Sequence, residues 1–438
     1  MDISIISLIG IIVGVALFVF MSFKKVPLVV AACMVALFIA LLSGQPIMGL
    51  ITGTWATGFA NFMKGYFFPL TLSAVIGKLM NDAGAARRIA MGFYGLIRKS
   101  KKNPKFTAMI VIPVLYTILT CCGISGFVVV FTMVGLSKEI MQEFDIPWRM
   151  YCYGGSTAMC QFWIPGSITL TNIAATKIAG VSLTAAPMFG IVITAAFWVV
   201  AVLLIWFELK KAEKNGEGFM DTGAEFLKTP MANARADGQE LPNLAVSILP
   251  LGCAMVLAVV FSVEIVIALF IGVVLASVCY HKYMPSYMQA LGDGVSSAFS
   301  PLMSSASATG VGSVIAAVPG FQIIMSGLST FPPVLEGMGY IIIICFALAS
   351  PAGGVSSFGP QALECMLGGG LSAGVSARLI ALSTFTGVPP HSPAIANVVA
   401  VTKIEYRHAV VVYLKVCLIG GGFASLVALL TINLGLFV

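Results

Sequence analysis

One motif, P-x-S-x4-N, occurs at residues 165–172 and again at residues 390–397, and its residue types suit the binding of a small anion. Proline removes a backbone donor and interrupts a helix. Serine and asparagine either satisfy the freed backbone groups or contact a bound ligand. The N–H groups at the start of a helix carry partial positive charge and bind anions. Each motif therefore predicts a broken helix with an anion-binding end.

The second motif contains His391, whose ordinary pKa near 6.5 is suited to a proton switch. Three interpretations stay open: a proton carrier, a ligand of a substrate carboxylate, and a structural histidine held by hydrogen bonds. Glu364 lies in an apolar stretch further upstream. It is either a second proton-coupling carboxylate or a residue near the membrane surface. An ionisable side chain within a membrane span is by default a functional candidate.

Two runs of small residues, at 120–126 and 350–357, interrupt apolar segments. Non-helical backbone at membrane depth is tolerated only inside the protein or beside a water-filled cavity. We therefore predict two re-entrant hairpins, at about 106–141 and 340–371, with broken helices at about 150–180 and 375–404. The candidate substrate-binding residues, taken from these four places, are Thr120, Gly123, Ser125, Gly126, Pro165, Gly166, Ser167, Asn172, Ser350, Gly353, Gly354, Ser356, Ser357, Thr386, Gly387, His391, Ser392 and Asn397.

The composition places these elements in a lipid bilayer. Of the 438 residues, 59% are hydrophobic and only 9% are charged. Soluble domains are about one quarter charged, so this chain cannot cover its apolar residues with a polar surface. A nucleic-acid-binding role is excluded for the same reason. The apolar runs are unbroken, which predicts an all-α polytopic membrane protein and not a β-barrel.

The net charge of +7 follows the rule that basic loops lie in the cytoplasm. Lys24, the run at 98–105 and the charged segment 208–243 are the basic connections. They predict a protein of the bacterial inner membrane with both termini outside. We expect 208–243 to be a solvated cytoplasmic linker without apolar periodicity. With three histidines and no metal-ligand spacing, the sequence predicts neither a metal site nor a cofactor.

The order of elements repeats on either side of the linker. Residues 1–207 and 244–438 each predict about five transmembrane helices, one of them broken, and one hairpin. The basic flanks of the first hairpin and the uncharged flanks of the second predict opposite orientations. Inverted repeats with broken helices at the membrane midplane are typical of secondary transporters. No enzyme motif or phosphate-binding loop is present, so we expect a transporter and not an enzyme.

The stretch at 77–90 resembles the signature of the gluconate permease (GntP-type) family of the ion-transporter superfamily. Residues 388–392 and 352–356 resemble two further segments of that family. The resemblance implies import of small hydroxy-carboxylates such as gluconate, D-serine or 3-hydroxybutyrate, usually with protons. It also implies a homodimer with a scaffold domain and a mobile transport domain.

We therefore expect a secondary active transporter that imports a small organic anion by proton symport with alternating access. Sodium symport stays open, because hydroxyl and carbonyl oxygens at the predicted tips would suit Na⁺ equally well. A passive anion channel is a weaker alternative, since channels close a pore by subunit symmetry and not by an inverted repeat. The expected partners are the anion, the coupling ion, the lipid bilayer and a second copy of the chain.

Overall fold

The computed structural model describes residues 2–24, 26–89, 91–92, 103–124, 126–229, 240–261, 263–284, 286–389 and 392–437. Within these ranges the chain forms helices and no β-strand, which confirms the all-α prediction. Several of the helices are long and apolar enough to cross a membrane. By length and composition the described chain has five such helices, or six if the bent pair α14 and α15 forms one span.

In the chain before the linker, η denotes a 3-10 or π-helical element. The elements are α1 (Ile3–Phe23), α2 (Leu28–Leu41), η1 (Gly49–Trp55), α3 (Ala56–Asp82), α5 (Pro104–Cys121), α6 (Gly126–Glu143), η2 (Trp148–Tyr151), α7 (Cys152–Thr157), η3 (Ala158–Phe162), α8 (Leu170–Ile178) and α9 (Pro187–Lys214). The segment 163–169 between η3 and α8 is not helical. It contains residues 165–169 of the first P-x-S-x4-N motif. The last three residues of the motif, 170–172, form the first turn of α8.

The rest of the chain begins with a helix inside the predicted linker, α10 (Phe219–Leu227). It continues with α12 (Leu244–Val259), α13 (Ile265–Tyr280), η4 (His281–Tyr283), α14 (Tyr287–Ala317), α15 (Pro319–Leu328), α16 (Pro333–Leu348), α17 (Pro351–Gly368), α18 (Ala373–Ser383), η5 (Thr384–Gly387), α19 (Pro393–Thr402), α20 (Tyr406–Leu414), η6 (Lys415–Gly421) and α21 (Gly422–Asn433). The second motif continues into α19, with Ser392 as the N-cap of this helix and Asn397 within it.

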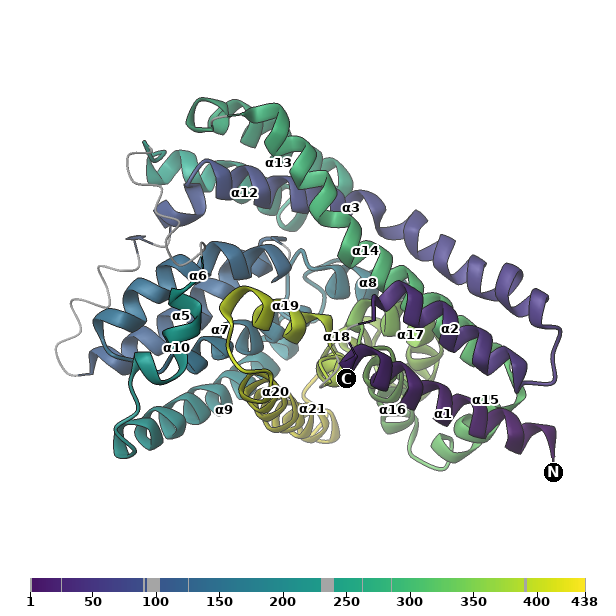
Figure 1. The fold of residues 1–438 in the computed structure, drawn as a ribbon. Helices are drawn as coiled ribbons and strands as arrows, with labels where there is room; N and C mark the ends of the chain where they lie inside the picture. Colours follow the sequence, from purple (N-terminus) through teal and green to yellow (C-terminus); the bar gives the residue numbers. More distant parts are fainter. Residues whose placement is uncertain are drawn as a thin grey trace.

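Figure 1 shows two groups of helices, and the long helices α3 and α14 run along one side of the molecule. Small residues allow these two helices to approach closely. A Cβ atom on Gly58 would lie 2.2 Å from Oγ of Ser313, and one on Gly294 would lie 2.9 Å from Cα of Val75. Small residues at helix crossings are the usual device by which membrane helices pack. Helices α2, α12, α13 and α15 pack onto this pair, and α1 packs on α2 and α15.

The second group contains both helix pairs at which we predicted hairpins. α5 packs against α6, and α16 packs against α17. The second turn is shorter than predicted, because only Ala349 and Ser350 separate α16 from α17. Residues 351–357, predicted as part of the tip, are helical. Pro351 at the first helical position and Ser350 as the N-cap start α17 there. The first arm also begins at Pro333, earlier than the predicted residue 340.

The prediction of a solvated linker without periodicity is wrong for its first part. α9 continues to Lys214, and α10 buries one face formed by Phe219, Gly223 and Phe226. The ring of Phe226 stacks on the fully buried Trp148, with 4.6 Å between centroids. Phe219, Gly223 and Phe226 are four and three residues apart, and this spacing places them on one helix face. The sequence therefore did indicate an amphipathic helix here.

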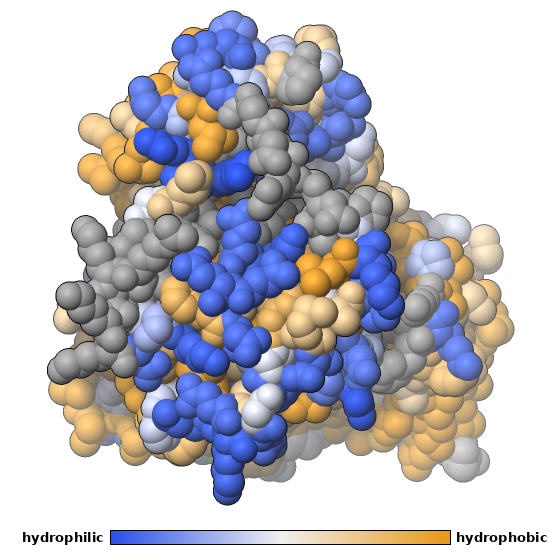
Figure 2. Space-filling view, turned by 60° about the vertical axis from the view of Figure 1, so that its left-hand side comes forward, coloured by the Kyte–Doolittle hydropathy of each residue, from blue (hydrophilic) through white to orange (hydrophobic). Residues whose placement is uncertain are grey.

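Charged residues hold the same region together. Arg149 donates from Nε and Nη2 to both carboxylate oxygens of Glu217, at 2.6 and 2.8 Å, and from Nη1 to Glu208 at 3.3 Å. The hydrogen bonds to Glu217 raise the pKa of Arg149 above its usual value. Figure 2 shows hydrophilic side chains gathered on this side of the molecule, between flanks that are largely hydrophobic. The linker therefore begins as an ordered polar cap at one end of the helices.

Candidate functional site

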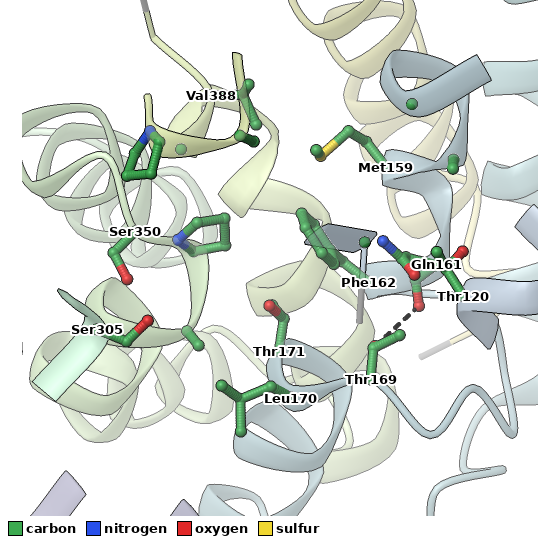
Figure 3. A pocket seen from close by; sticks show the side chains of 18 of the residues that line it. Thr120, Met159, Gln161, Phe162, Thr169, Leu170, Thr171, Ser305, Ser350 and Val388 are labelled. Atoms are coloured by element: carbon green, nitrogen blue, oxygen red, sulfur yellow. Dashed lines mark hydrogen bonds between the residues drawn. The ribbon is translucent and has the colours of Figure 1, made fainter. Parts of the chain in front are cut away.

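A cavity of about 220 Å³ lies where the two predicted hairpins and the two motifs meet (Figure 3). Its wall includes Gly126 at the start of α6 and Thr171 in the first turn of α8. It also includes Ala352 in the first turn of α17 and Ala394 in the first turn of α19. Within the described chain, four helices thus begin at one cavity. α2, α3 and α14 close it on another side, the last through Ser305.

The local sequence explains why α17 and α19 begin here. Each has proline at its first helical position and serine immediately before it. Oγ of Ser350 accepts a hydrogen bond from N–H of Gly353 at 3.1 Å. Oγ of Ser392 accepts one from N–H of Ala394 at 3.3 Å. Both serines line the cavity, so the caps that define the helix starts also define its wall.

The start of α8 is held in place by contacts to the first hairpin. N–H of Ile168 donates to the carbonyl oxygen of Cys121 at 2.8 Å. Oγ1 of Thr169 donates to the carbonyl oxygen of Gln161 at 3.2 Å. These two hydrogen bonds join the non-helical segment 163–169 to the end of α5 and to η3. The segment therefore presents the first turn of α8 to the cavity as a fixed edge.

The electrostatics of this cavity favour an anion. Among the described residues that line it, none carries a charged side chain, and the polar groups are hydroxyls, amides and backbone. The first N–H groups of a helix have no partner within that helix and carry partial positive charge. Four such ends around one small volume give a positive potential without a buried lysine or arginine in the described wall. A carboxylate is the anion that hydroxyl and N–H donors suit.

The structure divides the predicted site residues into three sets. Those that line the cavity are Thr120, Gly123, Gly126, Ser350, Gly387, Ser392 and Asn397. Those that lie nearby without lining it are Pro165, Gly166, Ser167, Asn172, Gly353, Gly354, Ser356, Ser357 and Thr386. Ser125 and His391 lie outside the described residues. Glu364, predicted as a coupling carboxylate, is exposed on α17 and does not line the cavity.

Two of the nearby residues serve the framework of the site. A Cβ atom on Gly354 would lie 2.3 Å from Sγ of Cys345 and 3.2 Å from its Cα atom. Gly354 therefore lets the two arms of the α16–α17 pair approach each other. A Cβ atom on Gly353 would lie 2.8 Å from Oγ of Ser350, which accepts its cap hydrogen bond. Both glycines shape the start of α17 without facing the cavity.

Asn172, the last residue of the first motif, is fully buried and has both ends of its amide engaged. Nδ2 donates to the carbonyl oxygen of Ser167 at 2.7 Å, across the break. Oδ1 accepts from Nη1 of Arg378 in α18 at 2.5 Å. Arg378 also donates from Nε to the carbonyl oxygen of Ala185 at 2.9 Å and from Nη2 to that of Leu183. Arg378 is 0% exposed, so this guanidinium ties α18 to the segment that frames the first break.

Sequence reasoning missed several residues of this region. The missed cavity residues include Gln161, Thr169, Thr171, Ser304 and Ser305. Thr169 and Thr171 stand inside the first motif, at positions that the motif leaves unspecified, whereas Gln161, Ser304 and Ser305 stand in no motif. Only the tertiary packing brings η3 and α14 to the hairpins. Arg378 did carry a signal, since it is a lone charge in an apolar helix, and such a charge within a membrane segment marks a functional candidate.

Comparisons with known proteins agree with this architecture. Residues 6–350 match the family model described as GntP family permease. The chain is 25% identical to "Uncharacterized transporter YxjC" of Bacillus subtilis (strain 168), covering 92% of this chain and 94% of that protein. The crystal structure of the Alcanivorax borkumensis YdaH transporter, described as having an unusual topology, is similar in fold alone. It has a TM-score of 0.50 and 16% identity, over 93% of this chain and 98% of that one.

The family match extends over most of the chain, from α1 to the turn between α16 and α17, and so includes two of the four helix starts at the cavity, those of α6 and α8. The apolar helices described above agree with an integral membrane protein. The chain belongs to the GntP family of permeases and is a membrane transporter.

Proposed function

We propose that this permease is a secondary active transporter that imports a small organic anion, a hydroxy-monocarboxylate of the gluconate or 3-hydroxybutyrate type. The observation that carries the proposal is the cavity at which α6, α8, α17 and α19 begin. Four positive helix ends and no charged side chain in the described wall suit one carboxylate group. The protein would act in the inner membrane of a bacterium, as a homodimer, with both termini outside.

Alternating access is the mechanism that we propose for this cavity. Each half of the chain contributes a helix pair and a broken segment to the cavity wall. If the halves form an inverted repeat, the same contacts can be rearranged to open the cavity to either face of the membrane. The position of the cavity between α2, α3 and α14 on one side and the second helix group on the other supports this movement.

The proposal is tested by measuring uptake into proteoliposomes in which the purified protein has been reconstituted. Radiolabelled 3-hydroxybutyrate and gluconate would be offered with an imposed proton gradient, a sodium gradient, or neither. We expect accumulation above the external concentration with the proton gradient alone. Accumulation that needs sodium would replace proton coupling by the alternative ion. Equilibration without accumulation under either gradient would indicate a passive channel, and no movement of either anion would overturn the proposed substrate class.

We further propose that His391 carries the coupling proton, because it stands beside Ser392 of the cavity wall in the sequence. Histidine changes charge near pH 6.5, within the range over which a proton gradient operates. We expect His391→Ala to abolish accumulation driven by a proton gradient and to retain exchange of internal for external substrate, which moves no net proton. Uptake and exchange would be measured in the same proteoliposomes, normalised to folded protein.

The two other interpretations of His391 predict different results. If His391 binds the carboxylate, accumulation and exchange fall together. If it is structural, both activities follow the amount of folded protein. Accumulation at the level of the wild type by a folded His391→Ala protein would remove this residue from the mechanism.

A further inference from the structure

Gln161 places an unpaired amide in the cavity. The residue lies at the end of η3 and is 8% exposed. Figure 3 shows its carboxamide projecting towards the cavity beside Phe162. No hydrogen bond from a described residue reaches this carboxamide, although the backbone oxygen of Gln161 accepts one from Thr169. Because the amide faces the cavity, its oxygen and its N–H groups are available to a ligand there.

The hydroxyl groups of the cavity differ in what they leave free for a ligand. Thr120 and Thr169 donate their protons to main-chain oxygens, Thr120 to that of Tyr116 at 2.8 Å and Thr169 to that of Gln161 at 3.2 Å. The oxygen of Thr120 remains as an acceptor, and that of Thr169, which accepts from Oγ of Ser167 at 3.4 Å, keeps one further lone pair. Ser350 and Ser392 instead accept from cap N–H groups, so their O–H protons remain as donors.

These two kinds of hydroxyl lie on different sides of the cavity. Figure 3 shows Thr120, Thr169 and Gln161 together on one wall and Ser350 on the opposite wall. An ionised carboxylate only accepts hydrogen bonds, so it fits the serine wall with the starts of α17 and α19. A neutral hydroxyl both donates and accepts. It finds acceptors in the threonine oxygens and both functions in the amide of Gln161.

We propose that Gln161 is a specificity-determining residue that binds the hydroxyl group of the transported hydroxy-carboxylate, whose carboxylate lies at the starts of α17 and α19. This inference rests on the proposed function and adds the orientation of the substrate. The amide Oε1 accepts the hydroxyl proton, and Nε2 donates to an oxygen of the same substrate. An acid that lacks the hydroxyl leaves the amide unpaired, and it binds more weakly for that reason.

The test compares each hydroxylated acid with its hydroxyl-free counterpart in proteoliposomes. Apparent affinities are measured by competition for 3-hydroxybutyrate against butyrate, and for gluconate against hexanoate. We expect the wild type to favour the hydroxylated acid of the transported pair. Gln161→Leu keeps the approximate size and removes the hydrogen bonds, and it should lower this preference about tenfold, which corresponds to the loss of one good hydrogen bond.

Two further variants control the experiment. Gln361→Leu makes the same chemical change on α17, at a residue that does not line the cavity, and should keep the preference of the wild type. Gln161→Glu keeps the shape and adds a negative charge, so it should weaken binding of both acids of a pair. It reports whether residue 161 faces the bound anion even where Gln161→Leu expresses poorly.

The outcomes separate this inference from the proposed function. If the wild type transports the anions but Gln161→Leu keeps its preference for the hydroxylated acid, Gln161 does not bind the hydroxyl, and the transporter assignment stands. An unchanged affinity of Gln161→Glu for both acids contradicts the inference as well. If the wild type binds none of the four acids, the proposed substrate class fails and the inference fails with it.

Discussion

Replacing Thr171 by aspartate is expected to lower the affinity for the transported anion about a thousandfold. Thr171 lies in the first turn of α8, is 3% exposed, and its hydroxyl points into the cavity in Figure 3. A carboxylate there would occupy the positive potential of the helix starts in place of the substrate. Two negative charges about 4 Å apart repel by about 4 kcal/mol at an effective dielectric constant of about 20. Competition binding with purified protein measures the loss.

Thr171→Asn is the matched control, because asparagine and aspartate have the same shape and differ in charge. We expect this variant to lose about tenfold or less in affinity. Thr171→Asp should still fold, since a negative charge in the first turn of a helix is stabilising. Equal affinities for the two variants would contradict the proposal that the cavity binds an anion through the helix starts.

The second large effect is expected for Arg378→Met. The methionine side chain cannot donate to Asn172, Leu183 and Ala185, whose oxygens Arg378 now engages. Each buried acceptor left without a donor costs about 1–3 kcal/mol. Removing a desolvated cation offsets part of this cost. We expect the free energy of unfolding in detergent to fall by about 2–4 kcal/mol, and uptake per folded molecule to fall as the first break loses its anchor.

Two variants test whether Arg378 acts through the geometry of its hydrogen bonds or through its charge. Arg378→Lys keeps the charge but lacks the forked geometry that reaches three acceptors, so it should resemble Arg378→Met. Arg407→Met removes an exposed arginine that pairs only with the exposed Glu405 among the described residues, and should change stability by less than about 1 kcal/mol. Full uptake by Arg378→Lys would assign its role to charge and not to the hydrogen bonds at the break.

The sequence was informative where a single residue type determines the local backbone conformation. In the structure Pro351 and Pro393, each preceded by serine, begin helices, and the described part of the second motif contributes Ser392 and Asn397 to the cavity wall. Ser350 followed by Pro351 has the same pattern. It indicates that α17 begins at residue 351 and therefore that the turn after α16 is short. The inverted relation of the two halves and their boundaries at 207 and 244 stay predictions.

The sequence was uninformative where packing decides which residues meet. Asn172 and Asn397 occupy equivalent places in the two motifs, yet Asn172 is buried against Arg378 while Asn397 lines the cavity. The difference comes from α18, which packs on α8 and supplies the guanidinium. Gln161 could not be singled out for a similar reason, because only the fold of η3 turns it into the cavity.

The central claim is that the transported anion binds in the cavity where α6, α8, α17 and α19 begin, and a structure with the bound substrate tests it most directly. Cryo-electron microscopy of the protein in nanodiscs with saturating 3-hydroxybutyrate or gluconate would locate the ligand. We predict density in the cavity, with the carboxylate in contact with Ser350 or Ser392 and the hydroxyl facing Gln161. Density more than about one helix diameter, roughly 10 Å, from all four helix starts would contradict the claim.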